Sequence, residues 1–187
     1  MRVLSLFSGC GGMDLGFEGG FNVLNKSVNT EIHPDWVEEK TNDRFIKLKK
    51  NNFQTVFAND IREDAQATWI NYFGNKGIEP GVYRVASIVD LVKKFEAGET
   101  DIFPKNIDIV TGGFPCQDFS VAGKSMGFLS DKGCDGKKII DESVRSDENR
   151  GQLYMWMRKV VSITKPNLFV AENVKGLVNL GDVKKII

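Results

Sequence analysis

The sequence contains one thiol in a setting suited to nucleophilic chemistry. Cys116 follows Pro115 in the segment 112–120, directly after the apolar run 107–111. That run is typical of a buried strand, so the thiol is expected at the carboxyl end of a strand, where open α/β sheets carry their active sites. Pro115 fixes its own φ angle and has no backbone donor, which stiffens the surroundings of the thiol. Taken alone, Cys116 could equally be a small buried apolar side chain.

Two acidic residues stand at comparable places in the chain. Glu172 follows the apolar run 168–171, and Asp60 ends the run 55–60, just before a helical pattern. In nucleotide-binding α/β folds an acid after a strand accepts hydrogen bonds from ribose hydroxyls, and a carboxyl can also act as a general acid. The alternatives are a solvated strand end for Glu172 and a helix N-terminal acid for Asp60.

A glycine-rich turn, 8–12, follows the β-prone run 3–7 and precedes the helical start 13–18. A strand, a glycine turn and a helix in this order can bring the backbone close to a nucleotide-like ligand. The glycines at 9, 11, 12 and 16 do not follow G-x-G-x-x-G, so a dinucleotide site matches poorly. A tight turn without a ligand is the alternative.

Five strand patterns alternate with helical patterns and together indicate how these residues are positioned. Strands are expected at 3–7, 55–60, 81–87, 107–111 and 168–171. Helices are expected from residue 13 and at 62–73, 88–95 and 151–161. This alternation predicts an α/β fold with a doubly wound, mainly parallel sheet. Right-handed crossovers then place Gly9, Asp60, Ser87, Cys116 and Glu172 along one edge.

Three further segments lie outside this pattern. The polar stretch 25–52 is expected to leave the core, with a short helix after Pro34, and His33 is expected at the surface. The glycine- and serine-rich stretch 120–150 has the length of an active-site lid. A last helix is expected to begin around residues 175–178.

Composition is that of one soluble globular domain. The 187 residues are 41% hydrophobic and 27% charged, with a formal net charge of zero. No apolar run is long enough to cross a membrane and no signal peptide is recognisable, so the cytoplasm is expected. Three cysteines and one histidine form no zinc pattern, so no metal is expected. Zero net charge removes the simplest argument for a nucleic-acid partner without excluding one.

Four motifs follow one another along the chain: 7–12, 113–117, 150–153 and 172–174. In type and order they make the chain resemble the amino-terminal part of a cytosine-5 DNA methyltransferase that uses S-adenosylmethionine. Together they span nearly the whole chain. The resemblance implies a Rossmann-like methyltransferase fold, truncated at the C-terminus, and methyl transfer to carbon 5 of cytosine in DNA, as in restriction-modification systems.

The resemblance also implies the roles of the two candidate catalytic residues. Cys116 would be the thiolate nucleophile that adds to carbon 6 of the ring. Glu172 would bond or protonate ring nitrogen 3, which works best if burial keeps its carboxyl partly protonated. The base that removes the carbon 5 proton is not identified by the sequence.

The S-adenosylmethionine pocket is implied in the same way. In this resemblance Asp60 takes the ribose hydroxyls, Ile61 lies against the adenine, and Ser87 stands where the family usually has aspartate. The full set is Phe7, Ser8, Gly9, Gly11, Gly12, Asp60, Ile61, Ser87, Ile88, Pro115 and Leu153.

The implied substrate is duplex DNA with the target cytosine flipped out and covered by the stretch 120–150. The family continues beyond its Glu-Asn-Val motif with an arginine-bearing motif, a target-recognition domain and a closing helix. We therefore expect 1–187 to be an incomplete catalytic domain, without a target-recognition domain. It would depend on a missing C-terminal region or a complementary chain, and would be inactive and bind cofactor weakly by itself.

Three other functions are compatible with parts of this pattern. A tRNA cytosine-5 methyltransferase would use the same nucleophile and acid, although Phe114 before Pro115 favours DNA. A catalytically inactive cofactor-binding module would keep the glycine turn without the chemistry. A nicotinamide-dependent oxidoreductase is disfavoured by the glycine spacing.

Overall fold

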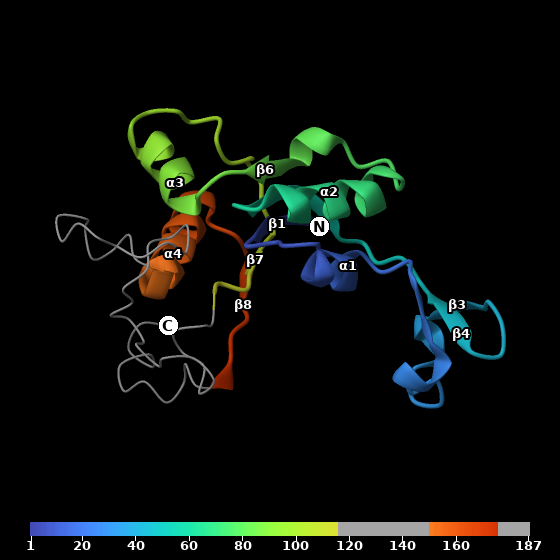
Figure 1. The fold of residues 1–187 in the computed structure, drawn as a ribbon. Helices are drawn as coiled ribbons and strands as arrows, with labels where there is room; N and C mark the ends of the chain where they lie inside the picture. Colours follow the sequence, from blue (N-terminus) through green and yellow to red (C-terminus); the bar gives the residue numbers. More distant parts are fainter. Residues whose placement is uncertain (116–149, 176–187) are drawn as a thin grey trace.

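A five-stranded parallel sheet forms the centre of the molecule (Figure 1). The computed structural model describes residues 1–115 and 150–175. The strand order is β6-β5-β1-β7-β8, and every neighbouring pair is parallel. The strands are β1 (Arg2–Leu6), β5 (Gln54–Asp60), β6 (Tyr83–Val85), β7 (Ile109–Gly112) and β8 (Leu168–Ala171). The strands predicted from sequence are thus confirmed, with the third shorter than expected.

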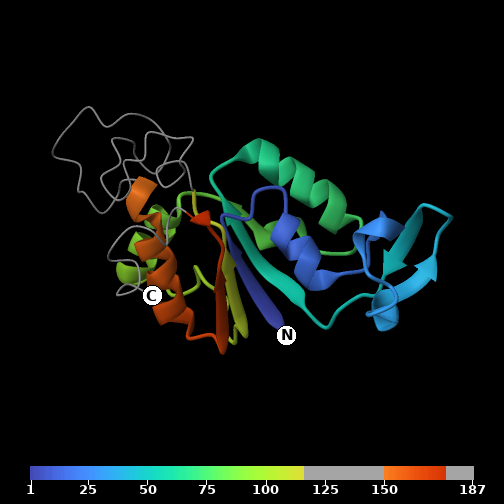
Figure 2. The ribbon, with the colours of Figure 1, turned by 90° about the horizontal axis from the view of Figure 1, so that it is seen from below.

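Helices cover both faces of this sheet, as Figure 2 shows. They are α1 (Gly12–Glu18), α2 (Glu63–Gly74), α3 (Ile88–Glu96) and α4 (Leu153–Thr164). One core cluster joins α3 and α4 to β1 and β7, and a second joins α2 to β5 and β6. The doubly wound arrangement predicted from sequence is confirmed, because strands that are buried on both faces need a helix layer on each side.

The ends of α3 and α4 follow from local chemistry. Ser87 accepts a hydrogen bond from the N–H of Val89 at 3.2 Å and so caps the start of α3. Lys93 and Lys94 lie in the last turn of α3, where positive charge complements the helix dipole. α4 ends at Thr164, and its C-cap residue Lys165 adopts a left-handed φ of 47° just before Pro166.

The polar stretch 25–52 contributes most of a second, smaller sheet that was not predicted from the sequence. The strands β2 (Asn22–Leu24), β3 (Val37–Lys40) and β4 (Phe45–Leu48) pair antiparallel in the order β2-β4-β3. The expected helix after Pro34 is a single 3₁₀ turn, Pro34–Trp36. Only Ile46 of this sheet is buried, so its strands carry too little apolar alternation to be recognised from sequence.

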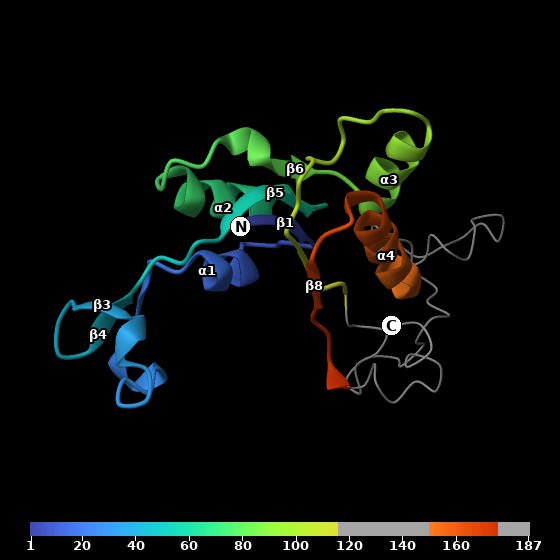
Figure 3. The ribbon, with the colours of Figure 1, turned by 180° about the vertical axis from the view of Figure 1, so that it is seen from behind.

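The small sheet lies beside α1 and away from α3 and α4, as Figures 1 and 3 show. Backbone hydrogen bonds attach it to the end of α1: Gly20 donates to the Lys49 carbonyl at 3.0 Å, and Asn51 donates to the Glu18 carbonyl at 2.8 Å. His33, expected at the surface, is half-buried because its ring stacks on Trp36 with centroids 3.9 Å apart. The stretch thus leaves the main core, as expected, but with an ordered fold.

Two predicted elements fall almost entirely outside the described residues. The proposed lid, 120–150, is described only at residue 150, and the last helix, expected to begin around 175–178, only at residue 175. None of the described helices combines the length and the hydropathy that crossing a bilayer requires.

Candidate active site

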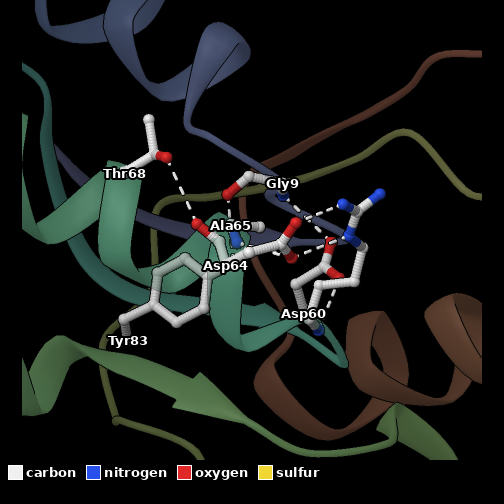
Figure 4. Close-up of polar contacts among 7 residues, drawn as sticks. Gly9, Asp60, Asp64, Ala65, Thr68 and Tyr83 are labelled. Atoms are coloured by element: carbon white, nitrogen blue, oxygen red, sulfur yellow. Dashed lines mark hydrogen bonds and ion pairs between the residues drawn. The ribbon is translucent and has the colours of Figure 1, made fainter.

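The carboxyl ends of the parallel strands form one edge of the sheet, and the predicted site residues that the structure describes follow these ends. Gly9 comes after β1, and its N–H donates to Oδ2 of Asp60, the last residue of β5, at 3.0 Å (Figure 4). The N–H of Ala86, after β6, donates to the backbone carbonyl of Asp60 at 3.0 Å. The structure therefore brings the glycine turn, Asp60 and the start of α3 together.

Ser8 holds the glycine turn to the neighbouring strand. Its hydroxyl donates toward Ser5 and accepts a hydrogen bond from the N–H of Asn59 at 3.0 Å. Its own N–H donates to the Asn59 carbonyl at 2.9 Å. The side-chain amide of Asn59, which is buried, donates in turn to the carbonyls of Arg84 and Ala86. Ser8 thus fastens the glycine turn to Asn59 of β5, and Asn59 in turn connects β5 to β6 and the residue after it.

The backbone of the turn is left-handed at three places. The φ angles are 53° at Phe7, 51° at Gly9 and 88° at Gly11. A Cβ atom at Gly9 or Gly12 would meet nothing within 4 Å, so open space lies beside the backbone there. A Cβ atom at Gly11 would come within 2.5 Å of the Phe73 ring. The turn therefore packs inward at Gly11 and presents bare backbone at Gly9 and Gly12.

Asp60 offers a carboxylate that the backbone already orients. Its Oδ2 accepts from Gly9, and its Oδ1 accepts from the N–H of Arg62 at 3.1 Å. Each carboxylate oxygen has two lone pairs, so both can accept a further hydrogen bond. Next to it, Ile61 is 45% exposed, while Arg62 forms an ion pair with Asp64. The edge thus combines an oriented acceptor with an accessible apolar side chain.

The other predicted pocket residues lie at different depths. Ser87 is half-buried and its hydroxyl already caps α3. Ile88 and Leu153 are each 3% exposed and belong to the core between α3 and α4. Pro115 is half-buried at the end of the described loop after β7. Ile88 and Leu153 are therefore core side chains, whereas Ser87 and Pro115 lie nearer the surface.

The segments that follow β7 and β8 are bound to each other. The N–H of Glu172 donates to the Gly112 carbonyl at 2.9 Å, and Glu172 Oε2 lies 3.2 Å from where a Cβ atom of Gly113 would be. The side-chain amide of Asn173 donates to the Phe114 carbonyl at 2.8 Å. The two predicted catalytic motifs are therefore adjacent, although Cys116 itself lies outside the described residues.

Glu172 differs from expectation in its surroundings. The role implied for this carboxyl works best when it is buried, whereas the side chain is exposed. It follows a strand at the edge of the described sheet, with Gly113 on its inner side. The described residues therefore do not bury the Glu172 carboxyl as its implied role as an acid would favour.

Several residues of the site were missed by sequence reasoning. The Tyr83 hydroxyl donates to the Gly9 carbonyl at 3.0 Å, and burial, together with nearby Asp60, raises the pKa of this phenol. Asp14 accepts a hydrogen bond from the indole N–H of Trp69 at 2.7 Å. The only signal in the sequence for Asp14 is that a charged residue stands on the face of a short helix that packs inward. Within residues 1–115 and 150–175, no three His, Cys, Asp or Glu side chains gather as a metal site would need.

Comparison with known proteins identifies relatives across almost the whole chain. A family model described as C-5 cytosine-specific DNA methylase matches residues 45–187. Type II methyltransferase M.BsuRI of Bacillus subtilis is 33% identical over 97% of this chain and 33% of its own length. Type II methyltransferase M.BspRI of Lysinibacillus sphaericus is 31% identical over 96% of this chain and 34% of its own length. The chain thus spans about one third of the length of these curated relatives.

Proposed function

Because the chain belongs to the family of C-5 cytosine-specific DNA methylases, we propose that the whole protein methylates carbon 5 of cytosine in DNA. The observation that carries this proposal is the adjacency of the segments 113–115 and 172–174. It brings the loop that leads to Cys116 next to Glu172 at the carboxyl edge of the sheet, as a shared active site requires.

The nucleophile in this proposal is Cys116. Carbon 5 of cytosine is a weak nucleophile, so the thiolate first forms a bond to carbon 6 and the electron pair of the 5,6 double bond moves toward carbon 5. After carbon 5 has taken the methyl group, a base removes the proton from carbon 5. That electron pair restores the double bond and the thiolate leaves. The thiolate is therefore regenerated, the ring has exchanged a proton for a methyl group, and the methyl donor would be left as S-adenosylhomocysteine.

Glu172 assists the addition of the thiolate from the other strand end. As the sulfur adds, negative charge accumulates on the ring, and a carboxyl that bonds or protonates ring nitrogen 3 stabilises that charge. The Glu172 N–H is bound to Gly112, which ties its backbone to β7 beside the loop that carries Cys116. The DNA itself would complete the burial of this carboxyl when a flipped cytosine enters the site.

The residues along β1 and β5 fit S-adenosylmethionine, the methyl donor that the family implies. When bound, this cofactor supplies the electrophilic methyl group. Gly9 and Gly12 present bare backbone to open space, Asp60 presents oriented acceptors suited to ribose hydroxyls, and Ile61 presents an apolar surface suited to a purine. Phe7 and Pro115 are half-buried at the same edge.

The remaining proposed pocket residues act less directly. Gly11 packs the turn onto α2, and Ser8 binds it to β5. Ser87, whose hydroxyl caps α3, would give the adenine an uncharged neighbour. Ile88 and Leu153 form the floor. The type II names of the relatives favour a restriction-modification role for this DNA methylation.

Covalent trapping tests this proposal. The full-length protein is mixed with S-adenosylmethionine and duplex DNA containing 5-fluorocytosine, whose carbon 5 carries fluorine in place of the proton that must leave. We expect an adduct that survives denaturing electrophoresis with the native protein and none with Cys116→Ser. Trapping on 5-fluorocytosine tRNA but not on the DNA would instead favour the RNA substrate. A native protein that traps neither nucleic acid, yet binds the cofactor, would contradict the assignment of Cys116.

A further inference from the structure

The inward side of the glycine turn rests on two aromatic rings of α2. A Cβ atom at Gly11 would lie 2.6 Å from Cδ1 of Trp69 and 2.5 Å from Cε2 of Phe73, so the backbone at Gly11 touches both rings. The two rings stack with centroids 4.3 Å apart. Since protein interiors are close-packed, a shift of the Trp69 indole must move the turn above it.

Trp69 is itself held from α1. The ring is fully buried, and its only polar atom, Nε1, donates to Asp14 Oδ2 at 2.7 Å. Asp14 lies three residues after Gly11, so the same short segment supplies the turn and the group that orients the ring beneath it. A tilted contact links Trp69 to Tyr83, with centroids 5.4 Å apart, and the Tyr83 hydroxyl donates to the Gly9 carbonyl.

If Asp14 served only to fill space beneath the glycine turn, a carboxyl would be an energetically costly side chain at this buried position. Asp14 is 0% exposed, and burial raises the pKa of its carboxyl, an effect that the hydrogen bond from the Trp69 indole partly offsets. Among the described residues its Oδ1 has no hydrogen-bond partner. A buried polar atom without a partner costs stability, which an apolar side chain of similar size would avoid.

We propose that Asp14 is a positioning residue for the cofactor loop. The Asp14 carboxylate holds the Trp69 indole, and the position of this ring fixes how closely the Gly11 backbone can approach α2. Trp69 also contacts Tyr83, whose hydroxyl orients the Gly9 carbonyl. Gly9 in turn orients Asp60 through its N–H. Asp14 thus influences cofactor binding through Trp69, without contacting the cofactor itself. This inference rests on the proposed cofactor site.

Glu18 provides a matched control on the same helix. It is 4% exposed, and its Oε1 accepts a hydrogen bond from the N–H of Thr55 at 3.0 Å. It lies one turn further along α1, toward the small sheet, and its side chain bonds to β5 rather than to the glycine turn. Asp14→Ala and Glu18→Ala each remove a buried acceptor, so both should lower Tm, but only the first should affect the turn.

The first measurement is calorimetric binding of S-adenosylhomocysteine to the full-length protein. We expect Asp14→Ala to raise Kd about tenfold, Asp14→Asn to stay within about threefold because it keeps an acceptor, and Glu18→Ala to stay within about twofold. In a Trp69→Phe background the Asp14→Ala change should add little, because the hydrogen bond is already lost. Methyl transfer at saturating cofactor should retain its kcat in Asp14→Ala, so that the loss appears in KM.

The second measurement needs no cofactor. Amide hydrogen exchange at Gly9 and Gly11 reports the turn directly, and Asp14→Ala should speed exchange at both while Glu18→Ala leaves it unchanged. Unchanged exchange and binding in Asp14→Ala, or equal effects of the two alanine variants, would overturn this inference. A native protein that does not bind S-adenosylhomocysteine, with the exchange effect intact, would instead overturn the proposed cofactor site.

Discussion

Asn173 donates its side-chain amide to the backbone carbonyl of Phe114 at 2.8 Å, across 59 residues of sequence. Its Oδ1 also accepts the N–H of Val174 at 2.9 Å, so both polar atoms of the amide are used. Phe114 is 6% exposed and immediately precedes the Pro115–Cys116 pair. This one side chain therefore ties the loop of the proposed nucleophile to the segment of the proposed acid.

Replacing Asn173 with alanine should impair the chemistry more than the fold. We expect Asn173→Ala to lower kcat of the full-length protein about 10- to 100-fold, because displacing a catalytic loop by about 1 Å is enough to slow the reaction strongly. The free energy of unfolding should fall by about 1 kcal/mol, the value of one hydrogen bond. Kinetics of DNA methylation and urea unfolding measure the two effects.

Asn167→Ala is the matched control, because Asn167 also uses its side-chain amide to contact a neighbouring segment, Asp108, but at the opposite end of β7 and β8. Its kcat should stay within about twofold of the native value. Equal losses of kcat in the two variants would show that general loosening of β8, rather than the tie to Phe114, sets the rate.

The glycines of the turn and of α1 should respond oppositely to alanine. At Gly11 alanine would need a left-handed φ, at about 1 to 2 kcal/mol, and its Cβ would displace the Trp69 and Phe73 rings, so Gly11→Ala should destabilise the protein by about 2 kcal/mol or more. Gly16 lies inside α1 with open space around it, so Gly16→Ala should stabilise by about 0.5 to 1 kcal/mol. Urea unfolding compares them, and a neutral Gly11→Ala would contradict the packing of the turn on these rings.

Replacing Asp60 should weaken cofactor binding, whereas replacing the nearby Asp64 should not. Asp60→Ala removes the acceptor of the Gly9 N–H and the proposed partner of the ribose, so Kd for S-adenosylhomocysteine should rise at least about tenfold, or about 1.4 kcal/mol. Asp64 forms an exposed ion pair with Arg62, and such pairs contribute little. Asp64→Ala should leave Kd within about twofold; a similar rise in both variants would exclude a specific role for Asp60.

The burial of Asp14 predicts a pH dependence of stability. Its pKa is raised above 3.8, chiefly by burial, so the folded protein holds this proton more tightly than the unfolded chain does. Stability is therefore greatest below pH 3.8 with respect to this group and declines as pH rises through the folded pKa. The amide introduced by Asp14→Asn cannot ionise, so the stability of this variant lacks this decline. The free energy of unfolding of Asp14→Asn should therefore rise relative to that of the native protein as pH increases from acid to neutral.

Urea unfolding of the native protein and Asp14→Asn across that pH range measures this difference. The exposed Asp64 is the comparison of opposite sign, since Arg62 lowers its pKa, so that its contribution is lost as pH falls. A difference between native and Asp14→Asn protein that does not change with pH would show that Asp14 is not buried as a titrating carboxyl.

The sequence by itself determined the parallel α/β sheet, because strand and helix periodicities are local and the strands are buried enough to show them. It also determined that the glycine turn and Asp60 share one edge of the sheet with the segments leading to Cys116 and Glu172, since parallel strands with right-handed crossovers allow no other arrangement. The motifs 7–12, 113–117 and 172–174 indicated the family on their own.

Only the tertiary structure decided which side chains hold these segments in place. The contacts of Asp14 with Trp69 and of Asn173 with Phe114 join residues 55 and 59 positions apart, and no local pattern records such pairs. The small antiparallel sheet escaped prediction because its strands are short and mostly exposed. Likewise, the depth of a side chain such as Ile88 depends on packing between elements, whereas sequence periodicity reports only which face of its own element it occupies.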